Sequence, residues 1–154
     1  MSERIRGAVF NILGDISGLT VLDAFAGSGA LAFEVLSRGA KSALLIELDQ
    51  AAFDTIKRNI DTLDLDEQVE AIRGNIKGWS NNNQAKKFDI IFCDPPYDAV
   101  LGLLIQKIAR HVATNGALVL SWPSHVEIPE LDDMSIVQKK TYGNATLVFY
   151  SKTG

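Results

Sequence analysis

Short apolar runs alternate along the chain with segments of helical periodicity, a pattern that excludes most fold classes. We predict strands at residues 20–25, 42–48, 69–74, 88–94 and 117–122. Apolar periodicity between them predicts helices at residues 28–37, 50–63 and 101–113. Strands that alternate with helices indicate βαβ units, so the predicted fold class is α/β with a mainly parallel sheet.

The two ends of the chain complete one predicted domain over residues 1–154. Apolar residues at helical spacing predict an N-terminal helix over about residues 2–13, with Ser2 as its candidate N-cap. Residues 135–151 predict a C-terminal hairpin that turns at Gly143 and Asn144. A chain of 154 residues has the length of one ordinary domain.

Composition predicts a globular protein of the reducing cytoplasm. No apolar run approaches the length of a membrane span, and the N-terminus lacks a signal-peptide pattern. Because Cys93 is the only cysteine, internal disulfides and Cys-based zinc sites are excluded, and we expect no metal. The net charge of -4 argues against a non-specific nucleic-acid binder. It allows an enzyme that contacts nucleic acid through a local basic patch.

Polar residues and glycines follow each of the five predicted strands. In a parallel sheet the carboxyl ends of the strands share one edge, where open α/β folds bind ligands. We therefore expect these groups to converge: Asp23 with Gly27 and Gly29, then Glu47 with Asp49, Asn75, residues 94–97 and residues 121–125. The alternative is that acids and glycines follow strands because turns require them.

The first of these groups includes a glycine loop of the G-x-G-x-x-A type, residues 27–32. Such a loop lets the backbone approach a ligand closely, and it is common in dinucleotide sites. Asp23 directly precedes the loop and would repel a pyrophosphate in a partly dry cleft. A ligand with a cationic ammonium and sulfonium is favoured instead, so we predict S-adenosylmethionine. An NAD-binding oxidoreductase is the alternative.

Two further side chains suit an adenosine ligand. Glu47 ends the second predicted strand, where an acid can accept hydrogen bonds from both ribose hydroxyls; otherwise it is a solvated acid beside a turn. Asn75 ends the third strand and either contacts the adenine or forms a simple turn. Ser28 is a better candidate than Asp23 for capping the helix after the glycine loop.

The fourth strand ends in Asp94-Pro95-Pro96-Tyr97, which suits methylation of an amine. The Asp94 carboxylate and the Pro95 carbonyl can accept hydrogen bonds from an exocyclic amine, so that its lone pair is directed at the methyl donor. Pro96 stiffens the backbone, and Tyr97 offers a flat face for a base. These four residues are the predicted catalytic set. The alternative is a rigid turn with a purely structural role.

The motifs together resemble the RsmD family of bacterial 16S rRNA guanine-N2 methyltransferases. The resemblance rests on ERIRGAVFNIL, VLDAFAGSGALAFEVLSRGA, LLIELD, FDIIFCDPPY and the ending TYGNATLVFY, and covers nearly the whole chain. It implies a Rossmann-like class I methyltransferase sheet of seven strands in the order 3-2-1-4-5-7-6, with helices on both faces. The cofactor site that we expect comprises Asp23, Phe25, Ala26, Gly27, Gly29, Glu47, Leu48, Asn75, Ile76 and Asp94.

The resemblance further implies a monomeric cytoplasmic enzyme with no membrane contact, acting on 16S rRNA in the small ribosomal subunit. Two features depart from the family: a basic segment usually precedes the arginine-rich helix, and Ser121-Trp122-Pro123 stands where the family tends to have Glu. We expect Arg4 and Arg6 to lie near the cleft and meet phosphates; the alternative is that they are ordinary solvated charges. Alternatives are N6-adenine methylation of DNA or RNA, methylation of a protein glutamine, and a cofactor-binding module without activity.

Overall fold

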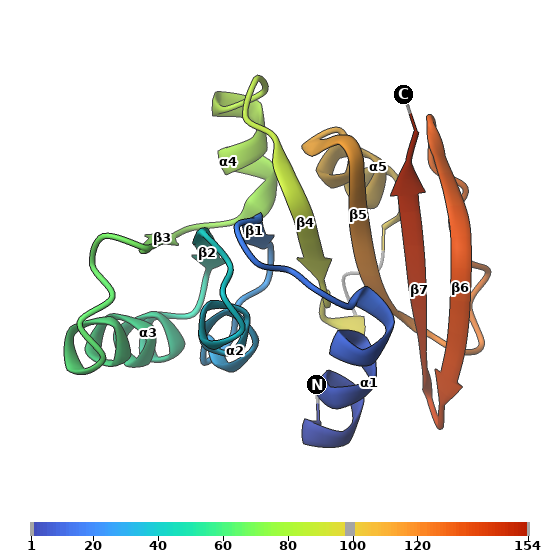
Figure 1. The fold of residues 1–154 in the computed structure, drawn as a ribbon. Coiled ribbons are helices and arrows are strands. Elements are labelled where there is room, and N and C mark those ends of the chain that lie inside the picture. Colours follow the sequence, from blue (N-terminus) through green and yellow to red (C-terminus); the bar gives the residue numbers. More distant parts are fainter. Residues whose placement is uncertain (1, 98–100, 154) are drawn as a thin grey trace.

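The computed structural model describes residues 2–97 and 101–153 and contains a seven-stranded sheet (Figure 1). The spatial order is β3-β2-β1-β4-β5-β7-β6, as predicted. β7 runs antiparallel to β5 and β6, and the other paired strands are parallel. The strands are β1 (Thr20–Asp23), β2 (Ser42–Glu47), β3 (Val69–Arg73), β4 (Phe88–Cys93), β5 (Val112–Pro123), β6 (Met134–Tyr142) and β7 (Ala145–Lys152).

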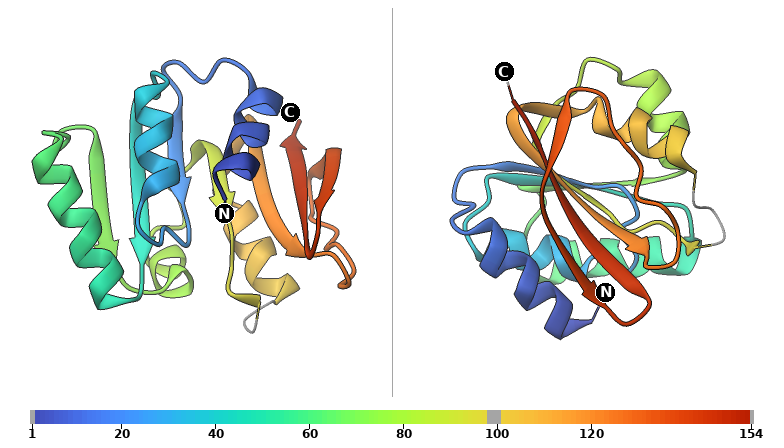
Figure 2. Two further views of the ribbon diagram at one scale, coloured as in Figure 1. Left: turned by 90° about the horizontal axis from the view of Figure 1, so that it is seen from below. Right: turned by 90° about the vertical axis from the view of Figure 1, so that its right-hand side faces the viewer.

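Helices cover both faces of this sheet (Figure 2). Three of them pack into one hydrophobic cluster: α1 (Glu3–Leu13), α2 (Ala30–Ser37) and α3 (Gln50–Thr62). The opposite face carries α4 (Ile76–Asn82) and α5 (Gly102–Ala109). Ser2 caps α1 as predicted, because its side chain accepts a hydrogen bond from the Ile5 backbone N–H.

The central strand β4 is buried on both faces. Ile90 and Phe92 pack in the cluster under α1–α3, whereas Ile91 and Cys93 pack in the cluster under α4 and α5. Each large apolar side chain buried in this way contributes about 1.5–3 kcal/mol to stability. Burial of β4 therefore fixes the position of the residue that follows it, Asp94. Cys93 is a core residue, and burial raises the pKa of its thiol.

Several predicted element boundaries were wrong, among them that of the strand expected at 20–25, which ends at Asp23. The helix expected at 101–113 ends at Ala109, because Val112 already pairs with Phe88 as the start of β5. β5 is thus longer than expected, with an irregular register near Asn115, whose φ is 66°. The helix expected at 28–37 begins at Ala30.

Two other features differ from the prediction. Gly29 is the N-cap of α2 and no side chain caps this helix, so the capping role expected for Ser28 is not found. Helix α4 was not predicted, because its sequence IKGWSNN lacks an extended apolar period. Among the described residues, no helix has the length and hydropathy needed to cross a membrane.

Candidate active site

A cleft of about 1060 Å³ opens at the carboxyl edge of the sheet, where β1, β2, β3 and β4 end. Most of the predicted site residues share its wall: Phe25, Gly27, Glu47, Leu48, Asn75, Ile76, Asp94, Pro95, Pro96 and Tyr97. They come from four strand ends that are far apart in the sequence. The parallel arrangement of these strands brings them together, as the strand pattern predicted.

The glycine loop is held by Glu47. One oxygen of its carboxylate accepts a hydrogen bond from the Gly27 N–H at 2.6 Å, and the other accepts from the Asp49 N–H at 2.8 Å. Gly27 has a φ of 59°, and the space in front of its Cα is open. Glu47 thus fixes the β1 loop against the β2 loop at the mouth of the cleft. A carboxylate has about four lone-pair sites, so Glu47 keeps acceptor capacity for a ligand.

The two glycines of the loop have different surroundings. Gly29 lines neither the cleft nor the small pocket beside it. A Cβ added at Gly29 would lie 2.8 Å from the Phe33 ring and 3.2 Å from both Ile56 and Leu45. Gly29 therefore lets the start of α2 pack closely on the sheet, whereas Gly27 faces the open cleft.

Asp23 is a buried acid at the end of β1. Its pKa is raised to about 7. Burial is the main cause, a backbone hydrogen bond from Phe25 opposes the shift, and the nearby carboxylates of Asp94 and Glu47 add to it. Three carboxyl groups thus meet at one end of the site, which makes it receptive to a cation and unfavourable for a phosphate. Asp23 lines a pocket of about 170 Å³ next to the cleft, together with Arg6, Ala26 and others.

The third strand end contributes a helix cap. The side-chain oxygen of Asn75 accepts a hydrogen bond from the Gly78 N–H at 2.7 Å, so Asn75 begins α4. Ile76 is buried behind it, whereas Leu48 is 62% exposed at the cleft rim. Leu48 and Ile76 can therefore offer apolar surface to a flat ring in the cleft.

The four residues after β4 change from buried to exposed along the segment. Asp94 is half-buried, Pro95 is buried, Pro96 is exposed, and Tyr97 is 46% exposed. Asp94 lines both the cleft and the small pocket beside Asp23, so it borders both compartments. A polar acceptor on a rigid segment, followed by an exposed aromatic ring, is suited to holding a planar amine.

The two N-terminal arginines have different positions. Arg6 lines the small pocket with Asp23 and lies 3.8 Å from the Glu34 carboxylate. The Arg4 guanidinium lies over the Tyr142 ring, 5.6 Å from its centroid. Their contact with phosphates stays a prediction.

Sequence reasoning did not assign several residues of the cleft wall: Gln50, Arg73, Lys77 and Leu104. Asp49, which was expected at this edge, does line the cleft. Arg73 ends β3 and Gln50 begins α3 shortly after β2, and these positions were the available signal. Residues 121–125 were expected to converge with the others, but they line neither the cleft nor the small pocket. The reason is that β5 continues to Pro123, where it pairs with Ala145 of β7.

The sheet order, the helices on both faces and the cleft at the carboxyl edge define the Rossmann-like class I methyltransferase fold. A solved structure described as "SMU.776, a putative methyltransferase complexed with SAH" shares the fold, with a TM-score of 0.78 at 14% identity over 96% of this chain and 48% of that chain. The family model described as "Conserved hypothetical protein 95" matches residues 1–151. The chain belongs to this family, the RsmD family indicated by its motifs.

Three relatives indicate the extent of the similarity. "Putative rRNA methyltransferase YlbH" of Bacillus subtilis is 32% identical over 99% of this chain and 87% of its own length. "Ribosomal RNA small subunit methyltransferase D" of Buchnera aphidicola is 41% identical over 62% of this chain and 50% of its own length, so the match spans half of that protein. A solved structure of a conserved hypothetical protein from Streptococcus pyogenes has a TM-score of 0.87 at 30% identity, covering 97% of this chain and 96% of that chain.

Proposed function

We propose that the chain transfers a methyl group from S-adenosylmethionine to the exocyclic N2 of a guanine in 16S rRNA. The observation that carries this proposal is the shared cleft. Gly27 and Glu47 line it, and so do Asp94 to Tyr97. A wall suited to an adenosine ligand therefore lies beside a segment suited to an amine.

The residues around the cleft fit the cofactor. Asp23 and Asp94 present negative charge to its ammonium and sulfonium groups, and Glu47 can accept hydrogen bonds from its ribose hydroxyls. Leu48 and Ile76 offer apolar surface to the adenine. When bound, the cofactor supplies an electrophilic methyl group on a cationic sulfur. We assign its binding to Asp23, Phe25, Ala26, Gly27, Gly29, Glu47, Leu48, Asn75, Ile76 and Asp94. Within this set Gly29 acts by shaping the loop, because it lines neither cavity.

Asp94 and the Pro95 carbonyl would orient the amine of the guanine. By accepting hydrogen bonds from its two N–H groups, they favour an amine lone pair that points at the reacting carbon. Positioning then supplies most of the rate gain. Pro96 restricts the backbone at this point. Stacking of the base on Tyr97 would add about 1–3 kcal/mol. The target base must be unstacked or single-stranded to reach this cleft.

The substrate class is supported by the names of the relatives. The Bacillus relative is named as an rRNA methyltransferase, and the Buchnera relative as a small-subunit methyltransferase. We infer that this chain acts on rRNA within the small ribosomal subunit, as a monomer in the cytoplasm. The buried acid Asp23 opposes the alternative of an NAD-dependent oxidoreductase, since a pyrophosphate at the loop would face its carboxylate.

Replacement of Asp94 by Ala tests the assigned role. Labelled methyl transfer to small-subunit rRNA should fall at least about a hundredfold, the usual contribution of one such acceptor or donor. Calorimetry should show that S-adenosylmethionine still binds, because the glycine loop and Glu47 remain. Full activity of the variant would contradict the proposal. Binding of NAD in place of S-adenosylmethionine by the wild type would contradict it as well.

A further inference from the structure

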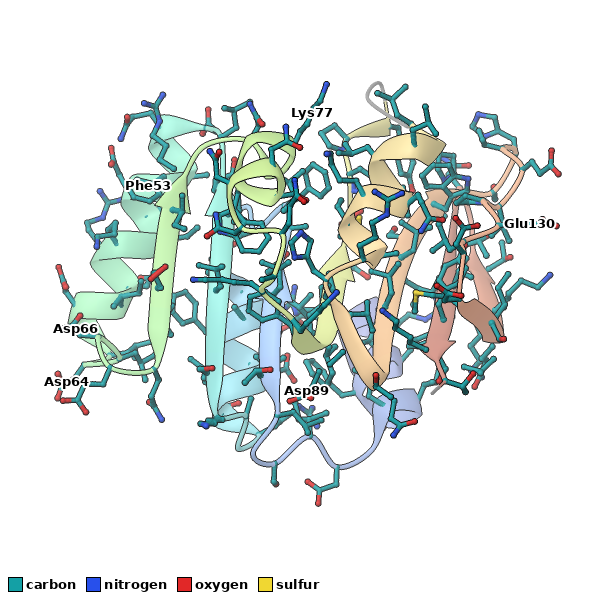
Figure 3. All side chains as sticks on the ribbon, turned by 90° about the horizontal axis from the view of Figure 1, so that it is seen from above. Phe53, Asp64, Asp66, Lys77, Asp89 and Glu130 are labelled. Carbon is teal, nitrogen blue, oxygen red and sulfur yellow. The ribbon has the colours of Figure 1, made fainter. Side chains whose placement is uncertain are left out.

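A chain of cavities runs from the active-site cleft along the face formed by α4 and α5. The cleft shares two wall residues, Lys77 and Leu104, with a second cavity of about 340 Å³. That cavity shares Lys107 with a third one, of about 280 Å³. Figure 3 shows the Lys77 side chain pointing outward from α4, at the start of this track.

The second cavity has an apolar wall. Leu101 and Leu103 are 61% and 89% exposed, and they line it together with Leu104. Lys77 and Lys107 complete its rim. Exposed apolar side chains next to ammonium groups are suited to a ligand with flat apolar faces and a negative charge, which is the chemistry of a nucleotide.

The third cavity is basic. Lys87, Lys107, Arg110 and Lys152 line it, and no carboxylate of the described residues does. The lysine ammonium groups donate to neutral acceptors: Lys87 to the Arg110 carbonyl, Lys107 to the Asn81 side chain, and Lys152 to the Val112 carbonyl at 3.1 Å. Their positive charges are held in place without being neutralised.

This concentration of positive charge contrasts with the chain as a whole, whose net charge is -4. Acidic residues gather elsewhere: Asp64 and Asp66 lie beyond α3, away from Lys77 (Figure 3). A neighbouring pocket that also contains Lys87 is lined by Asp66, Glu67 and Glu70. The acids there would repel a phosphate backbone, so the basic track ends at Lys87.

We propose that the α4–α5 face binds the single-stranded RNA next to the target guanine. The leucines contact a neighbouring base, and Lys107, Arg110 and Lys152 contact phosphates further along. This inference rests on the proposed function, because it takes the base in the cleft to belong to the same RNA strand. It explains how an acidic chain can hold RNA by a local basic surface.

The test is a triple variant, Lys107→Gln, Arg110→Gln and Lys152→Gln, in which each residue keeps a hydrogen-bond donor and loses its charge. A control with the same charge change, Lys41→Gln, Lys57→Gln and Arg58→Gln, alters exposed cations at the start of β2 and on α3. Binding of single-stranded 16S rRNA fragments is measured across salt concentrations. Each phosphate contact contributes about 0.7 to the magnitude of the slope of log affinity against log salt. Loss of three contacts in the triple variant should therefore reduce this magnitude by about 2.

A methyl-transfer assay distinguishes failure of this inference from failure of the proposed function. With the triple variant the KM for RNA should rise about tenfold or more, with kcat and S-adenosylmethionine affinity unchanged, whereas the control should match the wild type. An unchanged salt slope and KM, equal effects of both variants, or failure of the wild type to bind the fragments would overturn the RNA track. A defect confined to assembled subunits would overturn it too, because a ribosomal protein would then occupy this face. If the wild type transfers no methyl group to rRNA, the proposed function fails instead.

Discussion

Asp23 couples the stability of the fold to the charge of the site. Burial and the nearby carboxylates raise its pKa to about 7, whereas an aspartate in an unfolded chain titrates near pH 4. Between about pH 4 and pH 7 the folded state therefore binds more protons than the unfolded state. The free energy of unfolding that depends on Asp23 falls as pH rises through this window, and the loss is complete above about pH 7.

Replacement of Asp23 by Asn should remove this pH-dependent cost. The variant should gain stability over the wild type as pH rises, by a few kcal/mol at pH 8 relative to pH 4, since one pKa unit corresponds to about 1.4 kcal/mol. Urea unfolding at both pH values measures the difference. The affinity of the Asp23→Asn variant for S-adenosylmethionine should fall, because the cationic cofactor loses a buried counter-charge. A stability difference that does not vary with pH would contradict this account of Asp23.

The two loop glycines should respond differently to Ala. Gly27→Ala places a methyl group into the open cleft at a positive φ, so cofactor affinity should fall with a stability loss of about 1 kcal/mol. Gly29→Ala drives a methyl group into Phe33 and should lower the free energy of unfolding by about 1–3 kcal/mol or more. Calorimetry with the cofactor and urea unfolding give both values. Equal effects of the two substitutions would refute the separate roles assigned to these glycines.

At the level of elements, a buried histidine ties α4 to the start of β5. His111 Nδ1 lies 2.7 Å from the Lys86 carbonyl oxygen, which can only accept, so this nitrogen donates. Nε2 then accepts from the Ser80 hydroxyl at 2.7 Å. Burial lowers the pKa of His111, which favours the neutral ring that this arrangement requires. The unpredicted helix α4 is thereby anchored at its C-terminal end.

Loss of this link should destabilise the fold. His111→Ala leaves the buried Ser80 hydroxyl and the Lys86 carbonyl without this partner and opens a cavity, so the free energy of unfolding should fall by about 2–4 kcal/mol. Ser80→Ala removes one hydrogen bond and should lower it by about 1 kcal/mol. Thermal and urea unfolding provide the measurement. A neutral His111→Ala variant would exclude this role.

Sequence patterns predicted the elements that carry strong apolar periods. β4 was predictable because five of its six residues are apolar and the next residue is Asp94. α4 was not predictable, because Ile76 and Trp79 are its only large apolar side chains and too few to form a helical period. Its start is fixed by the Asn75 cap. The early start of β5 depends on pairing with Phe88, a long-range contact with no local signal. Likewise, the clamp between Glu47 and Gly27 spans 20 residues and is visible only in the folded chain.

For the molecule as a whole, the strand pattern of the sequence does not predict that β7 lies between β5 and β6. The apolar runs predict a parallel sheet, but the full strand order followed from the family resemblance. The same holds for the substrate. The cleft residues predict methylation of an amine on physical grounds, whereas guanine N2 follows from the RsmD resemblance alone. The relatives' names support rRNA as the substrate class.

A domain of this size has little surface with which to read a sequence, so we expect the shape of the small subunit to supply specificity. Small subunits from cells that lack the enzyme should be methylated with a kcat/KM about tenfold or more above that of naked rRNA fragments, a difference of about 1.4 kcal/mol. Subunits that already carry the modification serve as the control. Equal rates on fragments and on subunits would contradict recognition of the assembled particle.

The central claim is methylation of a guanine amine in small-subunit rRNA. Its direct test is transfer of a labelled methyl group from S-adenosylmethionine to small subunits of cells lacking the enzyme, followed by mapping of the modified nucleotide and atom. We predict a single N2-methylguanine in 16S rRNA that is absent with the Asp94→Ala variant. Absence of transfer, or label found on an adenine N6 or on a protein glutamine, would contradict the account.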